Sequence, residues 1–420
     1  MKEPSYKTIL SWGLYDWANS SFFTIVITYI FPAYFVKAVA PDHITGTYWW
    51  GNAIAFSALL VALGAPVFGA IADYGGKRKL WISICTYLGI IATGLLWFAY
   101  PNVDYAWHTL TAVILSVIAF EIGIAFYNSL LPSIAPPSHI GRVSGWSWGL
   151  GYIGGLLSLI ICLFAFVQGN FFGLSTDSSA NIRICGPFTA LWVYIFSRPL
   201  FMFVHDTPHQ KHPTKEAIKL GITTLWKTLK KLPKNRSLLF FFASRIFYID
   251  GLNTLFAFGG IYAAGTFNMN MSEVILLGIV LNITAGFGAM LFAWIDDWFG
   301  AKLTITVSLL CLSIAGTFIL LIKSKLAFWI LASILGTFVG PVQAASRSLL
   351  VRMVPEKKIT EMFGLFAFSG KATNFMGPWL VALLTKIFDS QRVGMTVIIL
   401  FFIIGLFGIQ KVSENHKVEV

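Results

Sequence analysis

Twelve apolar stretches follow one another through the chain, and each is long enough to cross a lipid bilayer as a helix. The hydrocarbon core of a bilayer is about 30 Å thick, so a spanning helix needs roughly 20 apolar residues. A lysine-rich polar segment divides the stretches into six and six. The expected spans are residues 13–36, 50–72, 80–99, 109–132, 143–167, 187–204, 238–266, 273–295, 303–322, 327–350, 361–385 and 393–410.

The composition does not suit a water-soluble fold. Hydrophobic residues make up 57% of the chain and charged residues 11%, whereas about a quarter of a soluble domain is charged. Lipid offers no partner for backbone hydrogen bonds, so apolar runs of this length form helices, and their unbroken hydrophobicity argues against a membrane barrel. The sequence therefore predicts an all-α integral membrane protein with several spans.

The charged loops indicate the orientation in the membrane. The formal net charge is +12. If the chain starts in the cytoplasm, the loops assigned to that side carry twenty lysines and arginines, and the opposite loops carry six. This excess is the positive-inside pattern, which predicts cytoplasmic termini and disfavours a nucleic-acid partner as the reason for the charge. The six residues on the opposite side are Lys37, Arg183, Lys323, Lys325, Lys386 and Arg392.

No enzyme motif is present in the chain. G-x-S-x-G, H-E-x-x-H and the P-loop pattern are all missing, and the seven histidines fall in expected loops or in the tail. The four cysteines are scattered without C-x-x-C spacing and are expected to be small core residues. We therefore expect a protein that is not an enzyme and uses no cofactor or metal. A metal held by His205, Asp206, His209 and His212 is the weaker alternative.

The two groups of spans repeat one another. Residues 16–20 (Asp-Trp-Ala-Asn-Ser) are echoed by 250–254 (Asp-Gly-Leu-Asn-Thr), and 69–73 (Gly-Ala-Ile-Ala-Asp) by 293–297 (Ala-Trp-Ile-Asp-Asp). Matches that keep their order are typical of transporter folds built from internal repeats. The expected organisation is an N-terminal six-helix bundle at 1–204, a linker at 205–237 and a C-terminal six-helix bundle at 238–420.

The linker has the pattern of a helix that lies on a membrane surface. Its apolar residues recur at helical spacing, and its lysines occupy other faces. Such a helix binds the anionic cytoplasmic leaflet, so we expect anionic lipids as partners, with a regulatory protein as the alternative. The apolar residues are Ile218, Ile222, Leu225, Leu229 and Leu232, and the lysines are Lys219, Lys227, Lys230, Lys231 and Lys234.

Residues 69–79 (Gly-Ala-Ile-Ala-Asp-Tyr-Gly-Gly-Lys-Arg-Lys) resemble the signature loop of the major facilitator superfamily, which lies between its second and third helices. Asp297, Gly300 and Lys302 resemble a degraded second copy. Tyr74 replaces the usual basic residue and Ala293 the usual glycine, so the gate is expected to close differently in the two halves. The resemblance implies a gating role for Asp73, Lys77, Arg78, Asp297 and Lys302.

Other segments narrow the resemblance to one branch. Residues 12–20, 346–350 and 363–371 are similar to the branch that contains vacuolar, autophagy-related amino-acid effluxers and their bacterial relatives. This resemblance implies two six-helix bundles, alternating access without ATP hydrolysis, and a bacterial cell membrane as the location. In the superfamily the first, fourth, seventh and tenth helices line the transport path, and here they carry Asp16, Glu121, Asp250 and Arg347.

Several of these ionisable residues are deep inside apolar spans. A charge at the bilayer centre costs about 2.5 to 3.5 kcal/mol on insertion scales, so each must pair, become neutral or face water. Amides three or four residues away share the helix face of Asp16, Asp250 and Arg347. Arg245, by contrast, is expected to extend toward the cytoplasm. The candidate substrate-binding or coupling residues are Asp16, Asn19, Glu121, Asp250, Asn253, Gln343, Arg347 and Lys371.

The mixture of both charge signs favours a zwitterionic solute such as an amino acid. A sugar site would need mainly neutral hydrogen-bonding groups. Glu121 and Asp250 are candidates for proton coupling, because burial lets a carboxylate take up a proton near neutral pH. A structural Glu121–Lys371 pair is the alternative for Glu121. We therefore expect a secondary active transporter, with a lipid or drug exporter, or a non-transporting receptor or scaffold, as alternatives.

Overall fold

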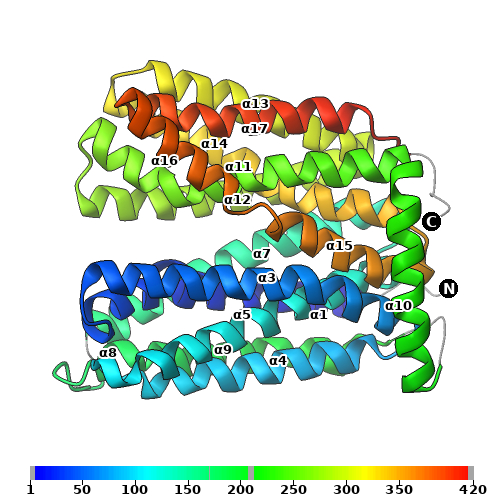
Figure 1. The fold of residues 1–420 in the computed structure, drawn as a ribbon, viewed down its shortest axis with the longest axis horizontal. Helices are drawn as coiled ribbons and strands as arrows, with labels where there is room; N and C mark the ends of the chain where they lie inside the picture. Colours follow the sequence, from blue (N-terminus) through cyan, green and yellow to red (C-terminus); the bar gives the residue numbers. More distant parts are fainter. Residues whose placement is uncertain (1–4, 170, 207–211, 415–420) are drawn as a thin grey trace.

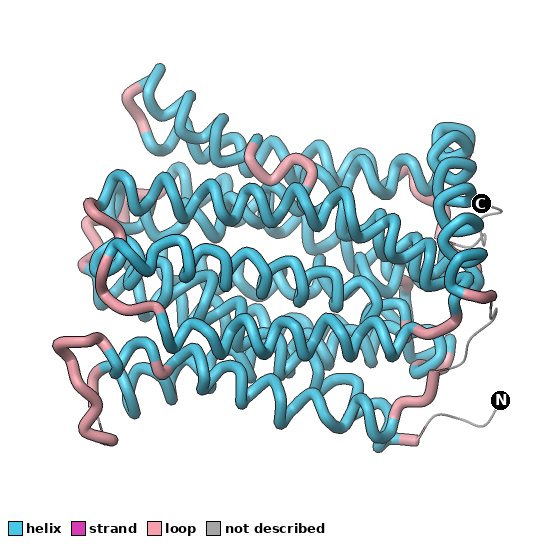
Figure 2. Tube along the Cα trace, turned by 60° about the horizontal axis from the view of Figure 1, so that its bottom comes forward, coloured by secondary structure: helices cyan, strands magenta, loops and turns pink. Residues whose placement is uncertain are grey.

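A computed structural model describes residues 5–169, 171–206 and 212–414. The expected terminal ends at 1–4 and 415–420, and residues 207–211 of the expected linker, including His209, lie outside the described residues. Long helices run side by side in the described part, which holds no strand, and their loops gather at two ends (Figure 1, Figure 2). The α1 helix begins and the α17 helix ends at the same end of the molecule, called here the terminal face. The opposite end is the distal face.

The helices before the linker pack together, and so do those after it. In the first group, α1 contacts α7 and α9, and α4 contacts α5 and α9. We call this group the N half; its helices are α1 (Tyr6–Phe22), α2 (Phe31–Tyr34), α3 (His43–Gly75), α4 (Arg78–Gly94), α5 (Ala106–Ser129), α6 (Leu131–Ile134), α7 (Ile140–Ile161), α8 (Ala180–Arg183) and α9 (Cys185–Phe203).

In the second group, α11 contacts α17, and α14 lies against α12 and α13. This group is called the C half, and α10 (Thr214–Lys231) connects the two. The C-half helices are α11 (Arg236–Phe267), α12 (Met271–Phe299), α13 (Ala301–Leu321), α14 (Lys325–Met353), α15 (Ile359–Lys371), α16 (Met376–Phe388) and α17 (Gln391–Gln410). The two halves lie one above the other in Figure 1.

Eleven described helical segments are long and apolar enough to cross a membrane, and the expected all-α membrane fold is confirmed. The expected span 361–385 differs, because it is broken into α15 and α16. Pro378 in the first turn of α16 has no N–H, and its ring would clash with the carbonyl of Asn374 in a continuous helix. A proline favours a kink in a helix, and here the helix is fully interrupted at residues 372–375.

The two halves meet closely near the terminal face. The α15 helix lies against α3 and α5, while α7 lies against α12 and α14. Glycines allow this approach: a Cβ added to Gly69 would lie 2.4 Å from the Thr360 carbonyl oxygen, and one added to Gly145 would lie 2.5 Å from that of Ala289. Gly69 belongs to α3 and faces Thr360 of α15, whereas Gly145 belongs to α7 and faces Ala289 and Ala293 of α12.

The linker helix α10 crosses the terminal face (Figure 1). Its buried side, which includes Gly221 and Leu225, packs on α3, where a Cβ added to Gly221 would lie 2.8 Å from the backbone nitrogen of Ile71. Ile218 and Ile222 belong to a second, exposed apolar stripe that continues through Trp226 and Leu229. The apolar positions thus form two adjacent stripes, one against protein and one uncovered.

Replacing Gly288 by alanine should destabilise the C half. A Cβ at this position would lie 1.8 Å from the Thr337 carbonyl oxygen, so α12 and α14 would have to separate. Overpacking of this kind costs about 1 to 3 kcal/mol. The matched control is Gly51→Ala on α3, where a Cβ would meet nothing within 4 Å. Thermal unfolding of the purified variants should show a lower Tm for Gly288→Ala only, and equal Tm values would contradict the packing described.

Candidate functional site

An arginine from the C half reaches three helices of the N half. One terminal nitrogen of Arg347 on α14 donates to Asp16 Oδ2 of α1 and to Asn128 Oδ1 of α5, each at 3.1 Å. Its other nitrogens donate to the hydroxyl and the carbonyl oxygen of Ser144 on α7, at 2.9 and 2.7 Å. Arg347 is 2% exposed. The guanidinium therefore joins α14 to α1 through an ion pair, and to α5 and α7 through hydrogen bonds.

Aromatic rings surround this ion pair. The Arg347 guanidinium lies 4.7 Å from the ring centroid of Trp12, 5.8 Å from that of Trp148 and 6.0 Å from that of Tyr127. The Ser147 hydroxyl donates to Asp16 Oδ2 at 2.6 Å. Aromatic faces attract cations and exclude water, which strengthens electrostatic interactions inside the site. The site thus offers a desolvated cation and a partly exposed carboxylate between flat apolar walls.

A second ion pair also joins the two halves. Lys371 Nζ at the end of α15 lies 2.6 Å from Glu121 Oε1 on α5, and both side chains are partly exposed. Its polarity matches that of the first pair, since the N half supplies the carboxylates and the C half the cations. Four of the eight candidate residues thus form two pairs between the halves.

Two of the candidate amides are not brought to these pairs. Asn19 is buried, and its Oδ1 atom has no hydrogen-bond partner among the described residues. Gln343 lies beside the Tyr152 hydroxyl of α7, one turn of α14 from Arg347. In the described part of the chain, the Oδ1 atom of Asn19 is therefore left without a donor from either pair.

The remaining two candidates meet at the interruption of α15 and α16. The Gly377 N–H donates to Asp250 Oδ2 at 3.3 Å, and Asn253 Nδ2 donates to Asn374 Oδ1 at 2.7 Å. Asp250 is 3% exposed and forms no ion pair with the described residues. These two residues of α11 thus hold the broken helix, and Lys371 of the second interhalf pair lies at the end of α15, just before the interruption.

Near the terminal face, Asp73 at the end of α3 binds the start of α15 in the other half. Its carboxylate accepts hydrogen bonds from the N–H groups of Thr360 and Glu361 at 3.2 and 2.8 Å. The Arg78 guanidinium lies 3.1 Å from the same carboxylate and also donates to the Glu356 carbonyl. A carboxylate at a helix N-terminus is stabilised by the unpaired N–H groups and by the helix dipole.

Asp297 makes the equivalent contact from the C half. It accepts from the N–H groups of Gly141 and Arg142 at the start of α7, at 2.7 and 3.1 Å, and from Arg142 Nε at 2.7 Å. Arg352 forms an ion pair with the neighbouring Asp296 at 2.8 Å. The arginines differ between the two contacts: Asp73 pairs with Arg78 of its own half, whereas Asp297 pairs with Arg142 of the opposite half and, at 3.5 Å, with Arg352 of its own half.

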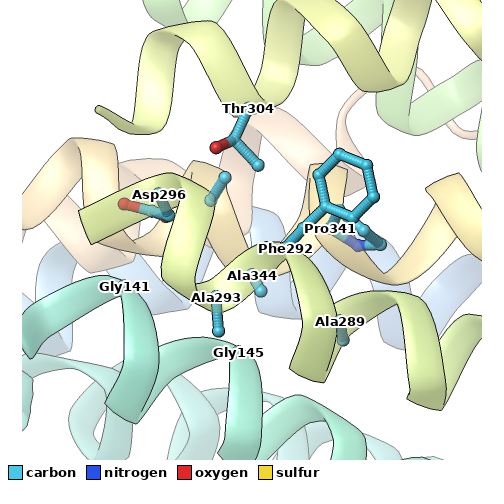
Figure 3. A pocket seen from close by; sticks show the side chains of 10 residues that line it. Gly141, Gly145, Ala289, Phe292, Ala293, Asp296, Thr304, Pro341 and Ala344 are labelled. Atoms are coloured by element: carbon cyan, nitrogen blue, oxygen red, sulfur yellow. The ribbon is translucent and has the colours of Figure 1, made fainter. Parts of the chain in front are cut away.

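The crevice beside Asp297 is tightly closed. Figure 3 shows Gly141 and Gly145 of α7 facing Ala289, Ala293 and Asp296 of α12. The space between these helices is too narrow to hold a water molecule. The halves are thus sealed against each other along this line.

The other two residues expected at the gate do not contact the opposite half. Lys77 is exposed, and its ammonium group makes no hydrogen bond or ion pair with the described residues. Lys302 Nζ donates to the Gln410 carbonyl of α17 at 2.8 Å, within its own half. Lysine stems are flexible and hydrated, so their place in the motif does not fix where the charge lies.

Sequence reasoning missed several partners of the site. Asn128, Ser144, Arg142 and Arg352 carried no signal beyond their residue type, because their role depends on how the helices are rotated. Arg245 was expected to extend toward the cytoplasm, and this is wrong. Its guanidinium is buried over the Phe366 ring and donates to the carbonyl of that residue and to the Ser369 hydroxyl.

In the part of the chain that the structure describes, no group of three or more His, Cys, Asp or Glu residues could hold a metal ion. The expected alternative at His205, Asp206, His209 and His212 includes a residue outside the described ranges. Asp206 instead accepts a hydrogen bond from the Lys79 N–H at 3.0 Å.

Solved structures share the fold along almost the whole chain. The proton:xylose symporter XylE bound to 6-bromo-6-deoxy-D-glucose gives a TM-score of 0.76 at 12% identity, covering 96% of this chain and 94% of that one. The transporter FucP in the outward conformation gives 0.75 at 11% identity, covering 96% and 97%. At this identity the likeness shows the fold.

Relatives are similar in sequence as well. The uncharacterized MFS-type transporter YxiO of Bacillus subtilis is 28% identical over 413 residues, 98% of this chain and 96% of its own. Autophagy-related protein 22 of Kluyveromyces lactis is 23% identical over 287 residues, which covers 63% of this chain and only 56% of the fungal protein. The model of the family described as "Vacuole effluxer Atg22 like" matches residues 50–419. The chain therefore belongs to the Atg22-like family of the major facilitator superfamily.

Proposed function

We propose that this secondary transporter moves a small zwitterionic solute, such as an amino acid, and that a proton gradient drives it. Family membership supports a transporter that works by alternating access. The identity of the solute and the coupling ion are inferences from the two ion pairs between the halves.

The observation that carries the proposal is the shared polarity of those pairs. The N half contributes Asp16 and Glu121, and the C half contributes Arg347 and Lys371. A zwitterion carries both charges. Its ammonium group can take the place of a C-half cation beside an N-half carboxylate, and its carboxylate can take the place of an N-half carboxylate beside a C-half cation. Binding then exchanges ion pairs within the protein for ion pairs with the solute, and one zwitterion can compensate one carboxylate of the N half and one cation of the C half.

The same argument ranks the alternatives. A sugar has no charge to replace either partner, and a separated ion pair inside the membrane is costly. A lipid or drug exporter would use the aromatic walls around Arg347 but only part of the charge. A receptor or scaffold gains nothing from two ion pairs between halves that never move apart. A zwitterion can meet a protein charge of each sign.

The excess of lysine and arginine near the terminal face supports a cytoplasmic location for both termini. The bacterial relative supports a bacterial cell membrane. In this orientation the contacts of Asp73 and Asp297 close the cytoplasmic side. We propose that these two carboxylates are the gate and that they lose their helix N-termini when the halves open toward the cytoplasm.

The exposed stripe of α10 is suited to the inner leaflet. Trp226 is 63% exposed, and exposed lysines border the apolar stripe, among them Lys219, Lys227 and Lys230. Apolar residues beside the protein contact and basic residues farther out are the pattern of a helix bound to anionic lipid. We propose that α10 binds the headgroups of the cytoplasmic leaflet.

Solutes of matched shape but different charge test the substrate class. We expect an amino acid to raise the Tm of the purified protein, whereas its amide and its deaminated acid, which each lack one charge, leave it unchanged. A ligand at 100 times its Kd stabilises by about 2.7 kcal/mol. Arg347→Gln should abolish the shift in Tm. This variant leaves Asp16 without its cation, so the double variant Arg347→Gln/Asp16→Asn, which has no such unpaired charge, should abolish the shift as well.

The control for this experiment is Lys386→Gln, an exposed cation on the distal side of α16 that makes no ion pair with the described residues. It should keep the full shift. Stabilisation by a sugar or by a lipid headgroup, with none by any amino acid, would contradict the zwitterion assignment.

Asp73→Asn should open the terminal face more often. The substitution removes the charge that binds the α15 N-terminus, an interaction worth about 0.3 to 2 kcal/mol. In a background without the native cysteines, a buried cysteine introduced by Ala344→Cys reports opening through its rate of maleimide labelling. We expect faster labelling with Asp73→Asn and no change with Asp104→Asn, an exposed residue on the distal side. Equal rates for both would argue against the gate.

Neutralising the α10 lysines should weaken the response to anionic lipid. Each lysine near an anionic surface contributes about 1 kcal/mol. The double variant Lys219→Gln/Lys227→Gln should lose much of the rise in Tm that phosphatidylglycerol produces over phosphatidylcholine. The matched control, Lys323→Gln/Lys386→Gln, neutralises two exposed lysines on the distal side. If both variants respond to phosphatidylglycerol like the wild type, α10 is not the lipid-binding element.

A further inference from the structure

The interruption between α15 and α16 places a helix N-terminus inside the protein. The α15 helix ends at Lys371 and α16 begins at Met376, and the two segments meet at an angle in Figure 1. The first turn of a helix has N–H groups without partners in that helix. These groups need an acceptor, and the residues of α11 lie beside them.

Two oxygens of α11 converge on Gly377 in this first turn. Asp250 Oδ2 accepts the Gly377 N–H at 3.3 Å, while Asp250 Oδ1 has no partner among the described residues. Thr254 is fully buried one turn farther along α11, and its hydroxyl also has no partner there. A Cβ added to Gly377 would lie 1.9 Å from Thr254 Oγ1 and 3.0 Å from Asp250 Oδ1, so both oxygens face the same backbone.

The charged groups around Asp250 are all engaged elsewhere or distant along their helices. Arg245 on α11 binds the Phe366 carbonyl and the Ser369 hydroxyl of α15, and Lys371 of α15 binds Glu121. Tyr248 of α11 shares a hydrogen bond with the Ser346 hydroxyl of α14. The remaining charged residues of the helices that pack on α11 are paired or lie toward the helix ends. Arg347 of α14 binds Asp16. The others are Glu361 on α15, Lys386 on α16, Arg392 and Lys411 at α17, Glu273, Asp296 and Asp297 on α12, and Lys325 and Arg352 on α14.

Asp250 therefore differs from the other deep carboxylates. Asp16 and Glu121 each have a cation within 3.1 Å. An ionised carboxylate without a countercharge inside a membrane protein costs several kcal/mol, and the usual outcome is that it binds a proton. The backbone of Gly377 lies close to both Thr254 Oγ1 and Asp250 Oδ1, so there is little room beside them. A proton needs no additional room. A protonated Asp250 carries no charge that needs compensation and still accepts from Gly377.

We propose that Asp250 binds the coupling proton and that this proton sets the bend between α15 and α16. The structure shows one donor to this carboxyl group, the Gly377 N–H, which is enough when Asp250 is neutral. When it is ionised, it attracts further N–H groups from the first turn of α16, and the interruption changes shape. The Asn253–Asn374 hydrogen bond keeps the two segments beside α11 during this change. The proton passes between Asp250 and water, so no other reactant is consumed.

This inference deepens the proposed function, because the bend would link proton binding to the position of α15, which carries both Lys371 and the contact of Asp73. Its test does not need the solute. Nitroxide labels introduced by Phe368→Cys and Leu383→Cys, two exposed positions on either side of the interruption, report the bend in the full chain. The native cysteines are replaced in this background.

We expect the distance between the labels to shift between roughly pH 5 and pH 9 in the otherwise unchanged protein, since burial brings a carboxylate into this range. Asp250→Asn, which is neutral at every pH, should abolish the shift and keep the low-pH distance. Thr254→Val should move the midpoint of the shift, because it removes a buried hydroxyl that faces the same Gly377 backbone as Asp250 Oδ1. Asp104→Asn, on the distal side, should leave the shift intact.

A distance that does not depend on pH, or a shift that persists in Asp250→Asn, would overturn the proposal. Either result leaves the zwitterion assignment untouched, since that assignment is judged by the Tm response to amino acids. Conversely, if no amino acid raises the Tm, the proposed substrate class is wrong. The pH-dependent bend is still judged separately, by the distance between the labels.

Discussion

The closed arrangement of this protein depends on carboxylates that bind helix N-termini across the two halves. Asp73 binds the start of α15 and Asp297 the start of α7, so each half contributes one carboxylate and one helix. Both interactions need backbones in near contact, which Gly69 and Gly145 permit. The Arg347–Asp16 and Lys371–Glu121 pairs can form only when these contacts hold the halves together.

The cost of charge in lipid explains how the remaining polar groups are arranged. The Arg347 guanidinium is buried and has four oxygen contacts, which satisfy it only while α14 stays beside α1, α5 and α7. Opening the halves would remove these partners together. The deep charges thus tie the position of the halves to the presence of a compensating charge, and a solute or a proton can supply one.

The fold and much of the site could be predicted from the sequence, for reasons that differ between residues. Span length and composition fix the helices, because lipid allows few alternatives. Depth selected Asp16, Glu121 and Lys371, since a buried charge needs a partner, and the resemblance to the superfamily added Arg347 on the tenth helix. Asp73 was expected at the gate, and the structure places its carboxylate at the N-terminus of α15 and beside Arg78.

What could not be predicted depends on helix rotation and on local breaks. Asn19 is only three residues from Asp16, yet its buried Oδ1 atom has no hydrogen-bond partner among the described residues. Pro378 indicated a kink, but the interruption at 372–375 and its contacts with Asp250 and Asn253 require α11 to lie alongside. Arg245 gave no sign that backbone oxygens of α15 would hold it inside.

The most direct test of the account is the distance between labels on the two halves at the terminal face. Lys77 and Lys357 are exposed there, one in each half, and suit nitroxide labels after substitution by cysteine. The account predicts two distance populations in lipid, a short one that matches this structure and a long one that grows with Asp73→Asn. A single short distance that persists with Asp73→Asn and with every amino acid would contradict it, because the halves would then not move apart.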